Sequence, residues 1–107
     1  MVSSQRAPRI DKRSHQRAPI QIAVVCERLD GASIGGTARD IGIGGMFIES
    51  SEQPDYAEPV VIVGRLPGAR HELRLPGVVR WSKADGFGVQ FGSLGAQETH
   101  AILSLVK

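Results

Sequence analysis

One short stretch of the sequence combines a carboxylate with a cluster of glycines. It runs Arg39-Asp40-Ile41-Gly42-Ile43-Gly44-Gly45 and leads into an apolar segment that begins at Met46. A carboxylate only accepts hydrogen bonds, so Asp40 can receive two of them from a planar donor edge such as that of guanine. Glycines permit φ > 0 and a close backbone approach, which predicts a tight turn or bulge. The alternative is an ordinary β-turn in which Asp40 bonds its own backbone.

A second candidate lies upstream, where Arg13 and Arg17 are spaced four residues apart before the first apolar segment. Each guanidinium is a planar fork of donors that can clamp a phosphate or stack on a base. The pair therefore suits a ligand with two phosphates and flat bases. His15 lies between the two arginines and is a candidate for contact with a phosphate or base. The alternative is a solvated basic tail, the usual interpretation of a short run of charges.

The charge of the chain is unevenly distributed. Its 107 residues include 13 Lys and Arg against 11 Asp and Glu, for a net charge of +2. Residues 1–19 hold five Lys and Arg side chains against one carboxylate, so they carry +4 and the rest −2. A basic arm on a slightly acidic body favours a polyanionic partner that meets the arm. We interpret the polar residues 1–12 as a flexible basic arm and residues 13–107 as one domain.

Several classes of protein are disfavoured. No apolar run approaches the roughly 18 residues of a membrane span, and the N-terminus lacks the apolar region of a secretory signal. We therefore expect a cytoplasmic protein. The one cysteine, Cys26, falls in an apolar strand pattern and is interpreted as a core residue. The three histidines show no metal-ligand spacing, and no catalytic triad or phosphate-binding loop is present. We expect no metal, no cofactor and no enzyme activity.

Short segments rich in β-branched residues indicate an all-β domain. Strands are expected at 20–26, 33–41, 45–50, 60–63, 71–81 and 87–91, with a short helix after Gly95. The fifth strand is expected to be interrupted at Pro76-Gly77, because proline cannot donate to a ladder. These elements fit a small antiparallel barrel or sandwich closed by a helix. In such a barrel Trp81 is expected to cap the core, with stacking on a ligand as the alternative. Arg80 is expected to point away from Trp81 into solvent, with a position facing the ligand groove as the alternative.

In order and spacing, these segments resemble a PilZ domain, the bacterial receptor module for cyclic di-GMP. Arg13 and Arg17 match its RxxxR motif, and the run from Asp40 to Gly45 matches its (D/N)xSxxG motif. The segments 77–81 and 86–91 resemble its closing hairpin. The resemblance extends from about Lys12 to the end of the chain. It implies a six-stranded antiparallel β-barrel with a short C-terminal helix.

The resemblance also implies the roles of the site residues. Arg13 and Arg17 would grip the phosphates of cyclic di-GMP and stack on guanine. Asp40 would read the Watson–Crick edge of a guanine, and Gly45 would shape the turn. Arg9 offers a second RxxxR register with Arg13 and can assist from the arm.

One residue departs from the motif, because Gly42 stands where the family has serine. The loss of one neutral hydrogen bond would weaken binding by about 0.5–1.5 kcal/mol, so Gly42→Ser is expected to tighten it. Two functions follow. The protein either binds cyclic di-GMP and relays the signal to a downstream protein partner, or is a degenerate PilZ domain that acts through protein contacts alone, for example in motility. Nucleic acid is a disfavoured partner, because few aromatic residues are available for stacking.

Overall fold

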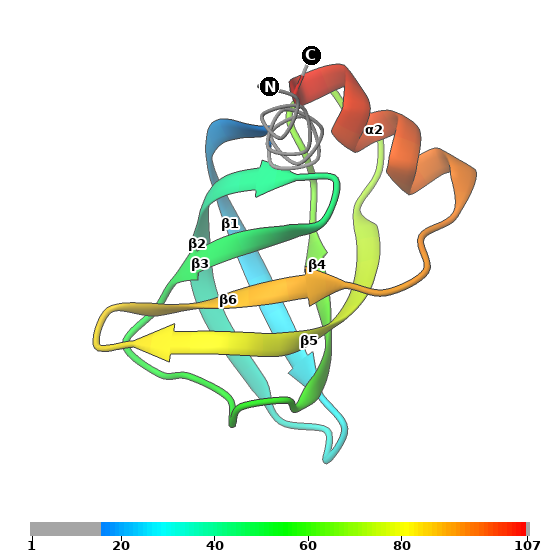
Figure 1. Ribbon diagram of the computed structural model, residues 1–107. Coiled ribbons are helices and arrows are strands. Elements are labelled where there is room, and N and C mark those ends of the chain that lie inside the picture. Colours follow the sequence, from blue (N-terminus) through cyan, green and yellow to red (C-terminus); the bar gives the residue numbers. More distant parts are fainter. Residues whose placement is uncertain (1–15, 107) are drawn as a thin grey trace, which may run out of the picture.

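The computed structural model describes residues 16–106. Over this range the chain forms six strands and one helix, shown in Figure 1. The strands are β1 (Arg17–Arg28), β2 (Ser33–Gly42), β3 (Gly45–Glu49), β4 (Pro59–Gly64), β5 (Leu73–Lys83) and β6 (Gly86–Phe91), and the helix is α2 (Ala96–Val106).

The strands of residues 16–106 close into an antiparallel barrel in the order β1-β2-β3-β6-β5-β4. Closure is completed where β1 pairs with β4, from Val24 opposite Gly64 to Arg28 opposite Val60. A closed barrel gives each strand two neighbours, although residues 17–23 of β1 pair with β2 alone. The predicted six-stranded barrel with a short C-terminal helix is confirmed.

Two strand predictions need correction. β1 begins three residues earlier than predicted, so that Arg17 already pairs with Gly42 across the ladder. β5 is not interrupted at Pro76-Gly77. In the ladders Pro76 pairs with Val61 of β4, because the ladder between β5 and β6 starts at Gly77, and its carbonyl accepts the N–H of Gly92 just after β6. The missing amide hydrogen is therefore tolerated at a place where pairing is one-sided.

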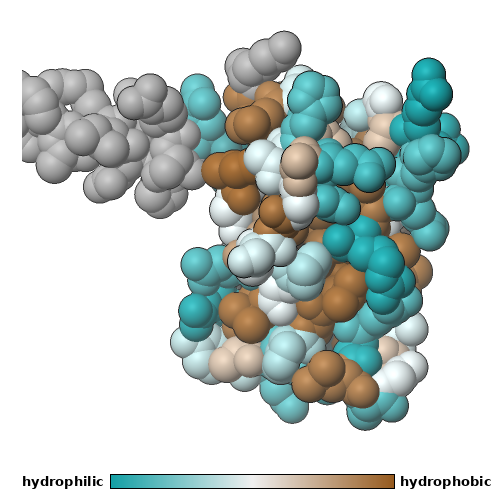
Figure 2. All heavy atoms as spheres, turned by 90° about the vertical axis from the view of Figure 1, so that its right-hand side faces the viewer, coloured by the Kyte–Doolittle hydropathy of each residue, from teal (hydrophilic) through white to brown (hydrophobic). Residues whose placement is uncertain are grey.

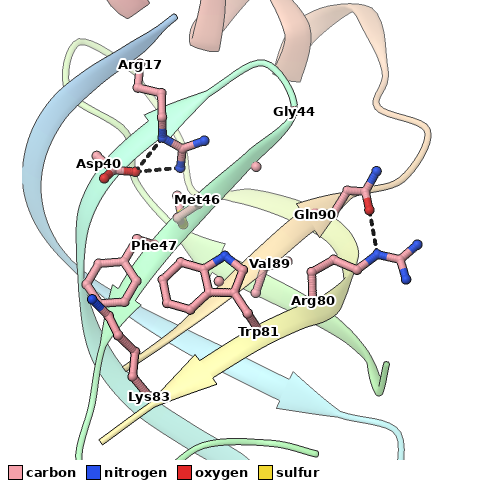
Figure 3. Close-up of a pocket in the computed structure, with 12 residues that line it drawn as sticks. Arg17, Asp40, Gly44, Met46, Phe47, Arg80, Trp81, Lys83, Val89 and Gln90 are labelled. Carbon is pink, nitrogen blue, oxygen red and sulfur yellow. Dashed lines mark hydrogen bonds and ion pairs between the residues drawn. The ribbon is translucent and has the colours of Figure 1, made fainter. Parts of the chain in front are cut away.

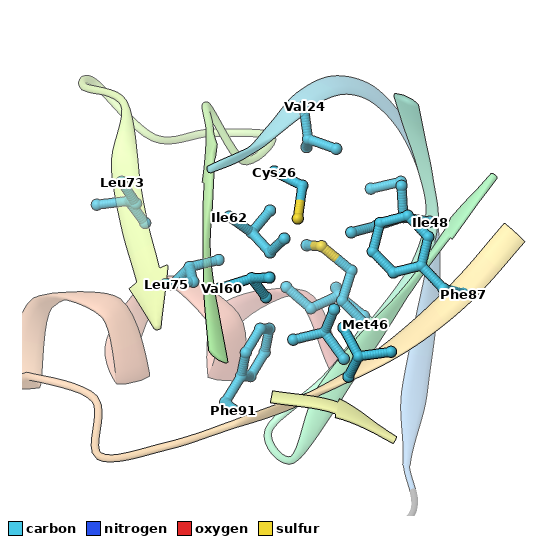
Figure 4. Packing of buried hydrophobic residues seen from close by; sticks show 14 of the residues in the cluster. Val24, Cys26, Met46, Ile48, Val60, Ile62, Leu73, Leu75, Phe87 and Phe91 are labelled. Carbon is cyan, nitrogen blue, oxygen red and sulfur yellow. The ribbon is translucent and has the colours of Figure 1, made fainter. Parts of the chain in front are cut away.

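Alternate strand residues point into the barrel and form one apolar core (Figure 4). Phe87, Val89 and Phe91 share its inner face, as their alternation predicts. Ile102 of α2 is fully buried in the same core, so the helix contributes to it as well. Cys26 is also buried, and burial, with a smaller contribution from the nearby Glu58 carboxylate, raises the pKa of its thiol to about 11. It is a neutral core side chain at pH 7.

Three β-bulges interrupt the alternation, and two of them decide the direction of polar and aromatic side chains. Ala38 and Val79 are fully buried, and strict alternation would send Asp40 and Trp81 inward as well. The ladder register shifts between Ala38 and Asp40, and again between Val79 and Trp81. Each extra residue turns the following side chain to the outside. Asp40 and Trp81 therefore lie on the outer surface of the barrel.

The face that carries α2 shows hydrophobic residues interleaved with hydrophilic ones (Figure 2). This mixture is ordinary for a protein surface. Over the described range, 16–106, no helix has the length and apolar character to cross a bilayer.

Candidate functional site

A pocket of about 490 Å³ opens on the outer face of the barrel, beside the turn that joins β2 to β3 (Figure 3). Its size lies within the range of about 300–1,000 Å³ that is usual for small-molecule sites. Five strands contribute to it, since its lining comes from β1, β2, β3, β5 and β6 and from the β2–β3 turn. The lining residues are Arg17, Asp40, Gly44, Gly45, Met46, Phe47, Arg80, Trp81, Lys83, Gly88, Val89 and Gln90.

The first two predicted site residues within the described range, Arg17 and Asp40, meet at one side of this pocket. Arg17 donates from Nε at 2.9 Å and from Nη2 at 2.5 Å, and both bonds go to Oδ1 of Asp40. Within residues 16–106, Oδ2 of Asp40 accepts no hydrogen bond. Asp40 belongs to β2 rather than to the turn, and the bulge before it gives it this outward direction. Among the described residues, one oxygen of this carboxylate is therefore left without a hydrogen-bond donor.

The glycines of the motif act through close approach. The turn between β2 and β3 is tight and is centred on Ile43 and Gly44. Among residues 16–106 the glycines with positive φ are Gly31 and Gly68, so the expectation of positive φ in this motif is wrong. Gly45 faces the neighbouring strand instead, and a Cβ there would lie 2.2 Å from the carbonyl oxygen of Val89. Gly45 is required because β3 and β6 are too close for any side chain at this position.

Gly42 has a similar role against β1. A Cβ at this position would lie 2.7 Å from the backbone oxygen of Gln16 and 3.3 Å from Cγ of Arg17. Gly42 is not among the residues that line the pocket. A serine here would have to displace the start of β1. The expectation that Gly42→Ser tightens ligand binding is therefore revised: the glycine permits the register that holds Arg17 beside Asp40.

Two aromatic side chains form a stacked pair along the pocket. Phe47 of β3 and Trp81 of β5 each pair with Gly88 of β6, which lies between them. Their ring centroids are 5.3 Å apart, with only 8° between the planes. A Cβ at Gly88 would lie 2.4 Å from the indole, so the ring rests directly on this glycine. Trp81 remains 45% exposed, and the prediction that it caps the barrel core is wrong.

Cations border the aromatic pair. Nζ of Lys83 lies 5.4 Å from the ring centroid of Phe47 and 5.5 Å from that of Trp81, within cation–π range. Arg80 also lines the pocket, and its Nε donates to Oε1 of Gln90 at 2.6 Å. Arg80 is exposed, as predicted, but it does not lie on the opposite side of β5 from Trp81, because the bulge places both side chains on the outer surface. With Arg17, three cations line the pocket against the single carboxylate of Asp40.

Arg9, Arg13 and His15 lie outside the described residues, as does the arm over 1–12. Within residues 16–106, no group of three or more His, Cys, Asp or Glu side chains is arranged to hold a metal ion.

Several residues that line the pocket were not predicted from the sequence. Phe47, Lys83 and Gln90 were assigned no part in a site. A signal for Phe47 and Trp81 exists in the sequence, since Gly86 and Gly88 alternate with Phe87 and leave a bare outer surface on β6 that neighbouring aromatic rings can cover. The bulge that turns Trp81 outward has no comparable signal.

The sequence matches the PilZ domain family over residues 11–107. A search of curated proteins gives no match.

Among solved structures, the PilZ domain of CeSA from a cellulose-synthesizing bacterium is similar, with a TM-score of 0.68 and 25% identity over 84% of this chain and 93% of that one. The Bacillus subtilis inhibitor of motility (MotI/DgrA) has a TM-score of 0.68 and 18% identity over 82% of this chain and 46% of that one. The Borreliella burgdorferi PlzA protein in complex with c-di-GMP has a TM-score of 0.70 and 16% identity over 99% of this chain and 46% of that one. The last two likenesses show the fold alone, and this chain spans less than half of those proteins.

The family match covers nearly the whole chain, and the barrel with its C-terminal helix agrees with the PilZ structures. PilZ domains are modules that bind cyclic di-GMP and are not enzymes. The chain belongs to the PilZ domain family of cyclic di-GMP receptors.

Proposed function

We propose that this protein binds cyclic di-GMP in the pocket beside Asp40 and relays the signal to a downstream protein. The observation that carries the proposal is the Arg17–Asp40 pair at the edge of a cationic pocket with an aromatic wall. Cyclic di-GMP combines two phosphates with two flat guanines, so it offers a complementary group to each of these features. The second messenger acts inside the cell, and the proposal therefore carries the expectation of a cytoplasmic protein.

Asp40 supplies the acceptor that a guanine edge needs. Guanine presents two adjacent donors, N1–H and N2–H, and a carboxylate can accept both. At present Oδ1 is occupied by Arg17, while Oδ2 is open among residues 16–106. Binding therefore exchanges one set of donors for another on the same carboxylate. Arg17 is released in the exchange and can turn to a phosphate, where a charge-assisted hydrogen bond is strong.

Opening the Arg17–Asp40 ion pair requires little free energy. The Arg17 and Asp40 side chains are 42% and 37% exposed, and exposed pairs of this kind contribute about 0–1 kcal/mol. Arg13 lies four residues before Arg17 and would supply a second guanidinium for the ligand. The change at the start of β1 would then remake the surface that a downstream partner recognises.

The second candidate function is protein recognition without ligand, and Gly42 is the observation in its favour. The family's serine hydroxyl is absent there, and the register of β1 leaves no room for it. In that case the Arg17–Asp40 pair would simply fasten the first residue of β1 to β2.

Calorimetric titration with cyclic di-GMP separates the two functions. The wild-type chain is expected to bind, and Arg17→Ala is expected to weaken binding about 10- to 150-fold, the equivalent of one charge-assisted hydrogen bond. Arg74→Ala is the matched control, because Arg74 lies on the outer surface of β5, bonds to Glu27 and does not line the pocket. A wild-type chain that melts cooperatively yet shows no heat at high micromolar ligand would exclude the proposal and favour protein recognition.

A further inference from the structure

A second pocket, of about 410 Å³, lies between α2 and the loop that joins β4 to β5. Figure 1 shows this loop passing beside the helix, at the end of the barrel that the helix covers. We propose that the pocket binds a small organic anion, whose phosphate or carboxylate group is held by Arg70 and whose apolar part packs on Leu73. Within residues 16–106 no residue lines both this pocket and the one beside Asp40, so the inference stands apart from the proposed function.

The loop forms a wall with a fixed conformation. The backbone N–H of Ala69 donates to the carbonyl oxygen of Leu66 at 2.9 Å, and Gly68 has a φ of 83°. Proline at the second of these four positions and glycine with positive φ at the third are typical of a type II turn. Nε of Arg65 donates to the carbonyl oxygen of Ala69 at 3.0 Å, and the side chain of Leu66 is buried. The wall is therefore formed before a ligand arrives, as is usual for small-molecule sites.

The opposite wall is one face of α2. Ile102 holds the helix in place, because its side chain is fully buried in the barrel core. The helical residues that line the pocket are spaced as i, i+3, i+4 and i+7 and so share a single face: Gln97, His100, Ala101 and Ser104. Leu73, at the start of β5, is buried and also lines the pocket. Together with Pro67, Ala69 and Ala101, it gives the pocket an apolar part.

The polar part of the lining consists mainly of hydrogen-bond donors. Its side chains with N–H groups are Arg70, His71, Gln97 and His100. The hydroxyl of Ser104 already donates to the carbonyl oxygen of Ala101 at 2.8 Å. Within residues 16–106 no Asp or Glu side chain lines the pocket, and Oε1 of Glu98 turns back to the start of α2, where it would lie 2.6 Å from a Cβ at Gly95. Such a lining favours a ligand with a negative charge.

Arg70 is the donor that can hold the charged group. Among residues 16–106 it makes no hydrogen bond or ion pair, whereas every other arginine in this range donates to a side-chain or backbone oxygen. A guanidinium offers two parallel N–H groups, which match two oxygens of a phosphate or carboxylate. The volume of the pocket and its mixture of apolar surface with a few polar groups are both typical of small-molecule sites.

An NMR titration with phenyl phosphate tests the assignment, because this probe joins an anionic group to an apolar ring. We expect saturable shifts of the backbone amide signals of residues 68–71 and 97–104. Inorganic phosphate lacks the ring and should bind at least about tenfold more weakly, since the burial of apolar surface is lost. Benzyl alcohol lacks the charge and should also bind at least about tenfold more weakly, since the charge-assisted hydrogen bonds are lost.

Arg70→Ala separates binding in this pocket from general attraction of anions to the surface. Arg70 is exposed, so its truncation should leave the fold intact. The affinity for phenyl phosphate at these signals should fall at least about tenfold, the equivalent of one charge-assisted hydrogen bond. Arg74→Ala is the matched control and should keep the wild-type affinity, because Arg74 bonds to Glu27 and does not line the pocket.

Three outcomes would overturn the inference. The amide signals of 68–71 and 97–104 would not respond to phenyl phosphate, inorganic phosphate would bind as tightly as phenyl phosphate, or Arg70→Ala and Arg74→Ala would bind the probe equally well. A response confined to the signals of the pocket beside Asp40 belongs to the first outcome, and it leaves the proposed function standing.

Discussion

Strand β1 begins and ends with an arginine that pairs with a carboxylate, and the two pairs are built differently. At the end of the strand, Arg28 donates from Nε and Nη2 to the two separate oxygens of Glu58, at 2.7 and 2.9 Å. At the start, both donors of Arg17 share Oδ1 of Asp40. The side chains of Arg28 and Glu58 are 25% and 15% exposed, and both residues of the first pair are more exposed than that.

The Glu58 carboxylate is fully engaged in local structure. Its Oε1 also accepts the backbone N–H of Asp55 at 2.8 Å, and the backbone of Glu58 bonds to Val79. The hydrogen bonds from Arg28, followed by the bond from Asp55, lower the pKa of Glu58, although partial burial opposes them. This pair fastens the loop over 51–58 to the barrel.

Under the proposed function, one pair of residue types serves structure at one end of the strand and recognition at the other. At Glu58 both carboxylate oxygens already accept hydrogen bonds, two at Oε1 and one at Oε2. At Asp40 one oxygen is open among residues 16–106, and the existing bonds cost little to exchange. The number of engaged acceptor atoms, rather than the presence of a salt bridge, separates the two roles.

The largest expected effect comes from removing each of the two carboxylates in turn. Asp40→Ala removes the acceptor of two guanine donors and should weaken cyclic di-GMP binding by at least about 100-fold, with the melting temperature close to that of the wild type. Glu58→Ala should lower the melting temperature by several degrees, with the ligand affinity close to that of the wild type. Calorimetry and thermal melts on both variants check the pair of outcomes. Loss of binding in both variants, or of stability in both, would contradict the division of roles.

The second effect concerns pH. Because the folded state lowers the pKa of Glu58 below its usual 4.5, the stabilisation by this carboxylate is present above about pH 4.5 and is lost as the pH falls through that value and the lower folded one. Glu58→Gln should therefore be less stable than the wild type at pH 7, and the two melting temperatures should converge in acid. A constant difference between pH 7 and pH 3 would show that the charge of Glu58 contributes nothing.

The sequence is sufficient to predict most of the barrel, because its information is local. The β-branched runs at 20–26 and 60–63 each predict a strand, and the pair Asp30-Gly31 predicts a turn. The apolar residues after Gly95 change from strand spacing to helical spacing, which predicts the helix. The bond between Arg17 and Asp40 was not predicted from the sequence, and their joint role in binding a ligand stays a prediction.

The surface around Asp40 is less predictable, because it depends on backbone irregularities. A bulge moves Trp81 from the inner to the outer side of β5 without any change in residue types, and the same device turns Asp40 outward on β2. The length of β1 depends on the register between Arg17 and Gly42, which the sequence of neither strand specifies alone. Bulges and registers arise from the closure of the whole barrel, and a strand-by-strand analysis has no access to them.

The smallest expected effect tests that register directly. Gly42→Ser places a Cβ 2.7 Å from the backbone oxygen of Gln16, whereas nothing lies within 4 Å of a Cβ at Gly44. Gly42→Ser should therefore cost about 1 kcal/mol of stability, at the low end for overpacking because the start of β1 can shift, and Gly44→Ser should be nearly neutral.

A shift at the start of β1 would move Arg17 but not Arg28. Only the Arg17–Asp40 pair should therefore be disturbed in Gly42→Ser. Binding of cyclic di-GMP to Gly42→Ser should weaken, but by less than in Arg17→Ala. The dependence of the melting temperature on pH that Glu58 causes should stay as in the wild type. Tighter binding in Gly42→Ser would mean that the serine hydroxyl contributes more than the register it disturbs. In that case Gly42 would be a lost ligand contact rather than the residue that lets β1 begin at Arg17.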